Sequence, residues 1–398
     1  MPWRTSSPMD QRTQFIADYR RDLDSLTTLC ERYRISRKTG YKWIARYNAE
    51  GPAGLHERSR RPGRCPHVTS SAVVKALLET RRHHPTWGAK KLLAILARRH
   101  PDWAWPARST TCDLLRRHGL IAARRRRARP GHPGRPLTPM TAPNGIWTAD
   151  FKGQFRTRNG AYCYPLTVVD GFSRYLLGCQ ALLGPTHQAT QPVFRRLFQE
   201  FGMPEILRTD NGVPFATSAL GRLSRLSVWW IQLGIYPELI EPAHPEQNGR
   251  HERMHRTLKK EATLPPSGSL AAQQRRFVTF RQEYNHLRPH EALDQNPPAS
   301  AYQPSNRTFP TRLAPIEYPP HFERRLVSHN GGIRWNARWV NVSHVLAEHH
   351  VGLEEIDNGL WNVFFGPLHL GRLNERNYRI EDHRGRQTRR KVLPMSPD

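Results

Sequence analysis

The pattern of apolar residues changes at a Pro/Gly-rich stretch, residues 129–145, and this change separates two kinds of structure. Before the stretch, apolar residues recur every three or four positions, which predicts amphipathic helices. After it, polar and apolar residues alternate or apolar residues run together, which predicts strands interleaved with helices. Because a domain contains about 100–200 residues, the 398 residues of the chain are expected to form several domains.

Three short helices are predicted near the N-terminus, over residues 10–20, 25–33 and 37–47. A tight turn joins the second helix to the third, and Ser36 is suited to cap the third helix. This order predicts a helix-turn-helix domain over residues 1–62, whose third helix presents basic side chains to the major groove of DNA. The residues expected to contact DNA are Arg37, Lys38, Lys42 and Arg46. A three-helix bundle that binds no DNA is the alternative.

A second helical domain is predicted over residues 66–122, after a basic Pro/Gly linker. Its helices are expected at residues 70–83, 85–100 and 108–118, and it is interpreted as a second helix-turn-helix domain. Residues 123–142 then form a basic linker arm. Its residues expected to follow DNA phosphates or enter a minor groove are Arg124, Arg125, Arg126 and Arg127. A solvated linker without DNA contacts is the alternative.

Positive charge is concentrated in the first third of the chain. Residues 1–140 contain thirty Lys and Arg against ten Asp and Glu, a net charge of +20 out of +29. This asymmetry predicts double-stranded DNA as a partner, and a ribosomal-type or merely soluble basic protein is the alternative. No apolar run is long enough to span a membrane, and no secretory signal is recognised. Five scattered cysteines without a CxxC pair predict no disulfide scaffold and no zinc site, so a cytoplasmic, nucleoid-associated protein is expected.

The order of elements after residue 145 predicts a mixed α/β sheet sandwiched by helices. Strands are expected at residues 146–157, 162–170, 175–183, 205–209 and 235–240, and helices at residues 188–201, 218–233 and 249–261. Asp150 lies on the first strand, Asp210 at the end of the fourth, and Glu252 one turn into the last helix. Converging carboxylates repel each other unless a hard divalent cation neutralises them, so these three are predicted metal ligands and catalytic residues. Two such cations suit in-line attack on a phosphodiester.

The motifs around these carboxylates resemble the DDE integrase core, the ribonuclease-H-like fold of retroviral integrases and many bacterial insertion-sequence transposases. They are WTADFK at 147–152, RTDNG at 208–212, PEQNGRHER at 245–253, and YNHLRPH at 284–290 with PPA at 297–299. The resemblance implies a catalytic core over residues 143–303. It also implies a DNA transposase that binds terminal inverted repeats of a mobile element, cuts DNA and joins 3′-hydroxyl ends to target DNA. Mg²⁺, with Mn²⁺ as a substitute, and a homo-oligomer are implied, and no zinc is expected.

The third carboxylate has two candidates. Between Asp210 and Glu246 lie 35 residues, the interval of the retroviral pattern, whereas 41 residues lie between Asp210 and Glu252. Alignment of the Asn-Gly turn and the rigidity of a helix both favour Glu252. The longer interval then requires an insertion, expected within residues 220–233. Asp170 is interpreted as a structural turn acid.

The predicted Glu252 helix carries further basic residues. Arg256 and Lys259 lie on the same face as Glu252 and, by the resemblance, hold the DNA end; a solvated basic face is the alternative. For His255, contact with DNA or Glu252 and a plain surface position stay open. Short alternating strands predict a small β-barrel over residues 315–382, followed by a basic tail, residues 383–398. A hydrolysis-only nuclease of the same fold and a catalytically inactive DNA-binding regulator are the alternatives for the whole chain.

Overall fold

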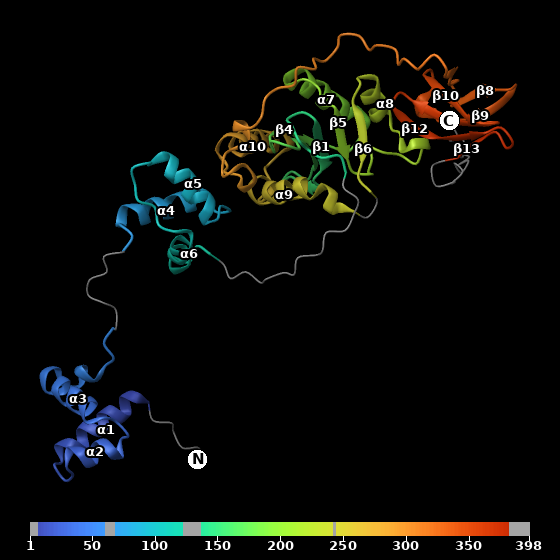
Figure 1. Cartoon of the computed structure of the whole chain (residues 1–398). Helices are drawn as coiled ribbons and strands as arrows, with labels where there is room; N and C mark the ends of the chain where they lie inside the picture. The colour runs from blue at the N-terminus through green and yellow to red at the C-terminus, as the bar shows by residue number, and fades with distance from the viewer. Residues whose placement is uncertain (1–6, 60–67, 122–136, 242–243, 382–398) are drawn as a thin grey trace. The chain divides into compact units, whose positions relative to one another are not determined.

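The computed structural model describes residues 7–59, 68–121, 137–241 and 244–381 (Figure 1). The chain divides into two compact units, Met1–Val68 and Thr69–Asp398. The four arginines predicted to follow DNA in the linker arm, residues 124–127, lie outside the described residues, and so does the basic tail.

The first unit is built from three helices, α1 (Pro8–Arg20), α2 (Leu26–Arg32) and α3 (Arg37–Glu50). Each begins after a serine whose hydroxyl accepts a hydrogen bond from a backbone N–H of the first turn, which satisfies a donor that the helix itself leaves free. The helices enclose a core that includes Phe15, Leu29 and Trp43. Helix α3 approaches α2 closely because Gly40 has no side chain: a Cβ there would lie 2.7 Å from Cys30 Sγ. The predicted three-helix order is confirmed.

The second unit begins with three more helices, α4 (Ser71–His83), α5 (Ala89–Arg99) and α6 (Arg108–Arg117). Their apolar stripes meet in a core that includes Leu77, Leu92 and Leu115. The second of these helices starts at Ala89 rather than at Pro85, because the preceding residues form a turn that ends in the N-cap Gly88.

A mixed sheet follows the linker arm. Its strands are β1 (Ile146–Phe151), β2 (Phe155–Arg156), β3 (Tyr162–Asp170), β4 (Leu176–Leu182), β5 (Ile206–Thr209) and β6 (Tyr236–Leu239). The strand order is β2-β3-β1-β5-β6, with β4 also paired to β3. Strand β1 is antiparallel to β3 and parallel to β5, so the predicted mixed sheet is confirmed. The single strand expected over residues 146–157 is wrong, because Gly153 at φ +85° interrupts it between β1 and β2.

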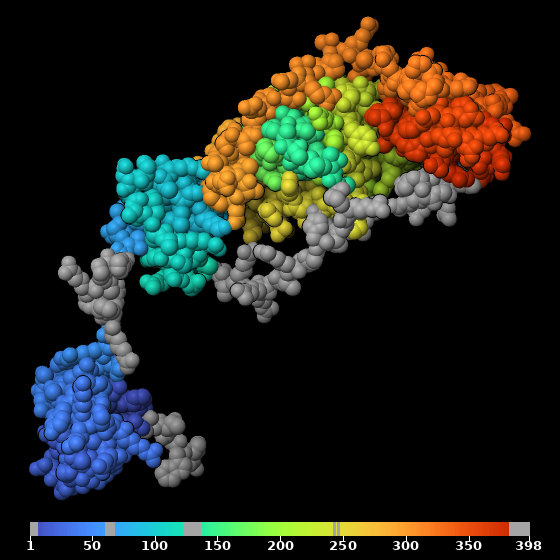
Figure 2. Space-filling view, viewed as in Figure 1, coloured from blue at the N-terminus to red at the C-terminus, as the bar shows by residue number. Residues whose placement is uncertain are grey.

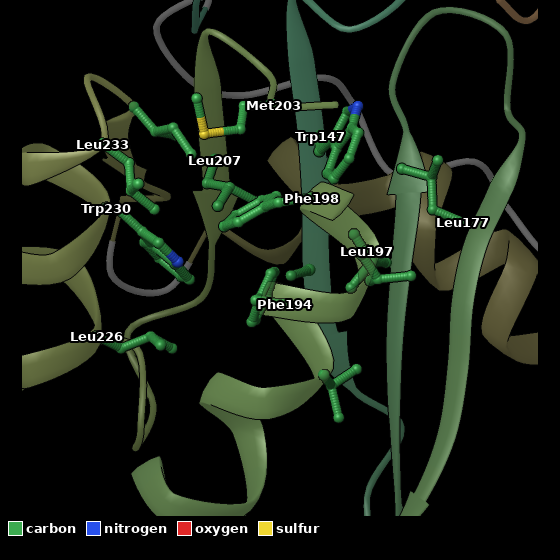
Figure 3. Close-up of a cluster of buried hydrophobic side chains, with 14 of the residues drawn as sticks. Trp147, Leu177, Phe194, Leu197, Phe198, Met203, Leu207, Leu226, Trp230 and Leu233 are labelled. Carbon is green, nitrogen blue, oxygen red and sulfur yellow. The ribbon is translucent and has the colours of Figure 1, made fainter. Parts of the chain in front are cut away.

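Helices cover the two faces of this sheet. Helix α7 (His187–Phe201) and helix α8 (Arg225–Gln232) pack on one face, where Trp147 of β1 lies against Phe198 of α7 (Figure 3). Helix α9 (Gly249–Leu258) and helix α10 (Leu270–Gln282) pack on the other face, in a cluster that includes Met254 and Phe277. Since alternate residues of a strand point to opposite faces, Asp150 projects toward α9. No helix in the described part of the chain is long and apolar enough to cross a membrane.

Two predicted helices have different bounds in the structure. The helix expected over residues 218–233 begins only at Arg225. It is preceded by a separate 3-10 turn, η2 (Leu220–Arg222), in which Gly221 has a φ of +64°. The helix expected over residues 249–261 ends at Leu258 and continues as a π-helical turn, Lys259–Thr263.

The C-terminal region forms an open five-stranded sheet and a separate hairpin. The sheet has the order β13-β12-β11-β10-β7, with β7 (Glu323–Leu326), β10 (His350–Asp357), β11 (Leu360–Phe365), β12 (Leu368–Asn374) and β13 (Arg379–Glu381). The hairpin contains β8 (Gly332–Trp335) and β9 (Arg338–Asn341). The predicted small barrel is not confirmed, because no pairing within residues 323–381 joins β13 to β7 and closes the sheet.

Two tryptophans tie the hairpin to the sheet. The indole Nε1 of Trp335 donates to Glu375 Oε1 over 2.8 Å, and that of Trp361 donates to the same oxygen over 3.0 Å. The C-terminal sheet also shares an apolar core with the α/β region. This cluster joins Leu220 and Ile231 to strand residues such as Val363, and Figure 2 shows the red C-terminal segment in direct contact with yellow-green residues.

Candidate active site

A chain of polar groups lies between the sheet and α9. Thr148 Oγ1 lies 2.8 Å from His251 Nδ1, and Thr167 Oγ1 lies 2.7 Å from both His251 Nε2 and His255 Nε2. The other ring nitrogen of His255, Nδ1, lies 3.6 Å from Asp150 Oδ2. The chain of contacts therefore ends at the carboxyl group of Asp150.

The hydrogen-bond pattern assigns the tautomers of the two histidines. Thr167 Oγ1 donates its single hydrogen to the backbone oxygen of Asp150 over 3.0 Å, so both Nε2 atoms must donate to this hydroxyl. Burial lowers the pKa of His251 to about 3 and that of His255 to about 2, so both rings are neutral at pH 7. The Nδ1 lone pair of His255 is left facing Asp150.

The carboxyl group of Asp150 lies in an unfavourable environment for its negative charge. Burial raises its pKa to about 7, and the charges of Asp210 and, more weakly, Glu252 contribute to the shift. Burial also raises the pKa of Asp210, while the backbone N–H of Gly212, 3.2 Å from Oδ1, opposes this change. A hard divalent cation stabilises such carboxylates by neutralising their charges. The donor set of Asp150, Asp210 and Glu252 fits such a cation.

The three predicted metal ligands lie on three elements. Asp150 is on β1, Asp210 directly follows β5, and Glu252 lies exposed in the first turn of α9. Their carboxyl oxygens do not all come within 4.8 Å of one another, whereas the ligand atoms of Asp150, His251 and His255 do. The rival Glu246 lies in the 3-10 turn Pro245–Asn248 that precedes α9.

The role of His255 was not resolved by sequence reasoning. Its side chain is 7% exposed and faces Asp150, so the surface position left open for it is wrong. A signal was present in the sequence: His251 and His255 are four residues apart, as are Met254 and Leu258, and all four share the buried face of α9. Asp170 is confirmed as a turn acid, since it is fully buried and accepts hydrogen bonds from the backbone N–H groups of Asn144 and Ser173.

The predicted DNA-contacting residues of α3 are mostly exposed. Arg37 and Lys38 are exposed, and the ammonium of Lys42 lies 4.2 Å from the ring centroid of the buried Trp43. Arg46 is partly buried, and its guanidinium carbon lies 5.1 Å from the centroid of the same ring. Tyr41, which sequence reasoning missed, is 62% exposed beside them.

On α9 and the turn that follows it, Arg256 and Lys259 are exposed, as Glu252 is. A basic surface therefore lies next to this carboxylate, consistent with a contact to a polyanion.

Four segments of the chain match known domain families. Residues 140–245 and residues 233–298 each match an integrase core domain. Residues 11–63 match a helix-turn-helix domain, and residues 39–115 match a homeodomain-like domain. The integrase matches include all three predicted carboxylates, and the other two cover the helices of both N-terminal regions.

Similar proteins come from bacterial insertion elements. The chain is 28% identical over 253 residues to an uncharacterized 39.2 kDa protein of insertion element IS476 from Xanthomonas euvesicatoria, covering 62% of this chain and 69% of the relative. It is 27% identical over 237 residues to an uncharacterized 31.7 kDa protein of insertion element IS407 from Burkholderia multivorans, covering 59% of this chain and 82% of the relative.

A solved structure gives a weaker likeness. The HTLV-2 integrase catalytic core, determined in complex with magnesium, aligns with 41% of this chain and 98% of its own, at 17% identity and a TM-score of 0.33. The assignment therefore rests on the sequence matches. These matches confirm the resemblance expected from the motifs: the protein resembles bacterial insertion-sequence transposases and carries helix-turn-helix domains and a core of the retroviral integrase type.

Proposed function

We propose that the protein is a DNA transposase that binds the terminal inverted repeats of a mobile element and joins 3′-hydroxyl ends to target DNA. The observation that carries the proposal is the position of Asp150 on β1, where the charges of Asp210 and Glu252 both act on its carboxyl group. Such a concentration of negative charge is unfavourable without a cation, and it serves phosphoryl transfer when a cation is present.

In this proposal Asp150, Asp210 and Glu252 hold Mg²⁺, for which Mn²⁺ substitutes. When bound to these three carboxylates, the metal would neutralise their charges and would supply the electrostatic stabilisation that phosphoryl transfer requires. The ring of His255 lies against the Asp150 carboxyl group, with Nδ1 3.6 Å from Oδ2, and restricts the positions that this carboxyl group can take. Arg256 and Lys259, exposed on the Glu252 side, hold the phosphates of the DNA end.

The remaining regions bind and arrange the DNA. Residues 1–62 and 66–122 recognise the element end, with Arg37, Lys38, Lys42 and Arg46 as the contacts on α3. The arm of residues 123–142 follows the phosphates, and residues 143–303 carry out the chemistry. Residues 315–382 and the basic tail add contacts to DNA or to a second subunit. Two element ends must be paired, so the active form is a homo-oligomer, at work where the bacterial nucleoid lies.

A strand-transfer assay tests the proposal. The purified chain is incubated with Mg²⁺, a labelled duplex that carries the element end, and a supercoiled plasmid. We expect labelled plasmid from the unaltered chain and none from Asp150→Asn, Asp210→Asn or Glu252→Gln. Glu246→Gln is the matched control and should keep the product. If the product is lost in Glu246→Gln but kept in Glu252→Gln, Glu246 rather than Glu252 is the third metal ligand.

The same assay separates the two rival functions. A hydrolysis-only nuclease of this fold releases nicked DNA but never attaches the label to the plasmid. A DNA-binding regulator binds the duplex in a salt-sensitive manner and gives neither nicks nor joined product with Mg²⁺ or Mn²⁺. Either result would overturn the proposal.

A further inference from the structure

A polar cavity lies at the N-terminal end of α9, apart from the three predicted metal ligands. Its volume is about 290 Å³, and its walls come from β1, the end of β3, the first turn of α9 and residues 137–140. None of the three predicted metal ligands, Asp150, Asp210 and Glu252, lines this cavity. The walls include Arg174, Arg208 and Arg250, which give the cavity a basic character.

Two of these arginines converge on one neutral atom. Arg174 Nη1 donates to the backbone oxygen of Gly171 over 2.7 Å, and Arg250 Nη1 donates to the same oxygen over 3.1 Å. Burial, followed by the positive charge of Arg250, lowers the pKa of Arg174 to about 10. Two like charges brought together in this way repel each other, and an anion between them would relieve the repulsion.

No carboxylate in the described part of the chain forms an ion pair with Arg174 or Arg250. Asp170 also lines the cavity, and its oxygens already accept hydrogen bonds: Oδ1 from the N–H of Asn144, and Oδ2 from the N–H and the hydroxyl of Ser173. Arg208 differs from the other two, because its Nε lies 2.6 Å from Glu238 Oε2 and its charge is balanced. The charge of Asp170 partly offsets that of Arg174, whereas among the described residues the charge of Arg250 is met only by other arginines.

A second, independent feature points to a ligand. Asn248, the N-cap of α9, lines the cavity, is only 6% exposed and makes no side-chain capping bond. Its Oδ1 has no hydrogen-bond partner among the described residues. Rotation of the amide by 180° would present its NH₂ group instead, which is a donor for an anion. The free N–H groups of the first turn of α9 add to this set of donors.

We propose that the cavity between Arg174 and Arg250 binds one phosphate of the DNA backbone. The guanidinium forks match phosphate oxygens, and the helix N-terminus favours negative charge. The choice of DNA as the source rests on the proposed function. Arg250 is exposed, so a phosphate that approaches from the surface can reach its guanidinium.

The salt dependence of DNA binding tests the source of the phosphate. Binding of the full chain to a labelled duplex is measured by fluorescence anisotropy over a series of salt concentrations. We expect Arg250→Gln and Arg174→Gln each to reduce the slope of log K against log salt by about one, as for one lost phosphate contact. Arg312→Gln removes an exposed arginine outside the cavity and is the matched control, with an unchanged slope.

Inorganic phosphate tests the site without DNA. It should raise the melting temperature of the unaltered chain and of Arg312→Gln, and the rise should be lost in Arg250→Gln, each variant being compared with and without phosphate. Stabilisation by phosphate with unchanged slopes in both variants would assign the cavity to a free anion and overturn the DNA proposal. Absence of both effects would overturn the site itself. Failure of the proposed function is separate, because it appears as DNA binding without joined product.

Discussion

His255 Nδ1 lies 3.6 Å from Asp150 Oδ2, and the opposite ring nitrogen of His255 lies 2.7 Å from the hydroxyl of Thr167. The ring is thus fixed from the β3 side and limits the positions that the Asp150 carboxyl group can take. Residues that orient ligand groups in this way typically contribute about 10–100-fold to metal affinity or activity.

We therefore expect His255→Phe to slow strand transfer about 10–100-fold under single-turnover conditions at saturating DNA, with little change in the affinity for DNA. His255→Asn, which keeps a polar side chain, should retain more of the rate and require less Mg²⁺ for half-maximal activity than His255→Phe. An unchanged rate and unchanged metal dependence in His255→Phe would show that the ring only fills space.

Asp150 should make the metal-free protein less stable as pH rises. Its folded pKa of about 7 lies above the ordinary value of 3.8, so the folded state binds the proton more tightly than the unfolded state. The contribution of Asp150 to the unfolding free energy is then highest below pH 4. It falls by at most roughly 1.4 kcal/mol per pH unit as pH rises from 4 to 7.

Urea unfolding in chelator between pH 4 and pH 8 measures this contribution. Asp150→Asn should flatten the decline, whereas Asp102→Asn, at an exposed site, should leave it unchanged. Mg²⁺ should stabilise the unaltered chain more at pH 8 than at pH 5, because protons compete with the metal for the same carboxylates. Equal effects of Mg²⁺ at both pH values would contradict the placement of the metal at Asp150.

Gly40 should be intolerant of even one methyl group. Alanine normally stabilises a helix interior by about 1 kcal/mol relative to glycine, but a Cβ at residue 40 would lie 2.7 Å from Cys30 Sγ. We expect Gly40→Ala to lower the unfolding free energy of the first unit by about 1–3 kcal/mol. In thermal melts, the double variant Gly40→Ala, Cys30→Ala should be less destabilised than the sum of the single variants, since removal of the sulfur makes room. Strict additivity would show that the two sites do not interact.

Glu375 should stabilise the C-terminal sheet because its carboxylate accepts hydrogen bonds from the indole N–H groups of two tryptophans. In Glu375→Ala, the buried indole N–H of Trp335 and the partly buried one of Trp361 lose their acceptor, at a cost of about 1–3 kcal/mol. Glu375→Gln keeps one carbonyl oxygen and should lose less. Urea unfolding followed by tryptophan emission measures both variants, and equal stability of Glu375→Ala and the unaltered chain would contradict the prediction.

Arg37 and Lys38 should contribute phosphate or base contacts from the start of α3. Both are exposed there, so the double alanine variant should fold normally but bind the element end more weakly, with a salt slope smaller by up to about two. Replacement of the exposed Arg312, which lies outside the regions proposed to bind DNA, is the control. A slope that does not change would remove these two side chains from the DNA interface.

Local patterns in the sequence predicted those elements whose ends carry their own signals. Strand β3 occupies residues 162–170 as expected, because an Asn-Gly turn precedes it and its apolar run is continuous. The division between β1 and β2 was missed because alternation continues past Gly153, and only its positive φ ends the strand. Leu220 and Leu223 fit a helical stripe, but they pack instead on the C-terminal sheet, a contact between distant segments that no local pattern reveals.

At the candidate site, too, the features marked by local motifs were predicted and those that depend on distant residues were not. The three carboxylates were found because each stands at the end of an element within a distinctive motif. The environment of His255 was not predicted, because it depends on Thr167 of β3, which lies 88 residues away in the sequence. Closure of the C-terminal strands into a barrel was expected from their number and length. It depends on pairing between the first and last strands, which short-range alternation does not encode.

The shared core of η2, α8 and the C-terminal sheet bears on how such proteins can change in evolution. A chain shortened at residue 310 would expose Leu220, Leu223, Val228 and Ile231 together, and an apolar patch of this kind promotes aggregation. The α/β region and its C-terminal sheet are therefore expected to be inherited as one piece. The helical domain of residues 8–55 has its own apolar core and can be replaced without exposing the core of the second unit.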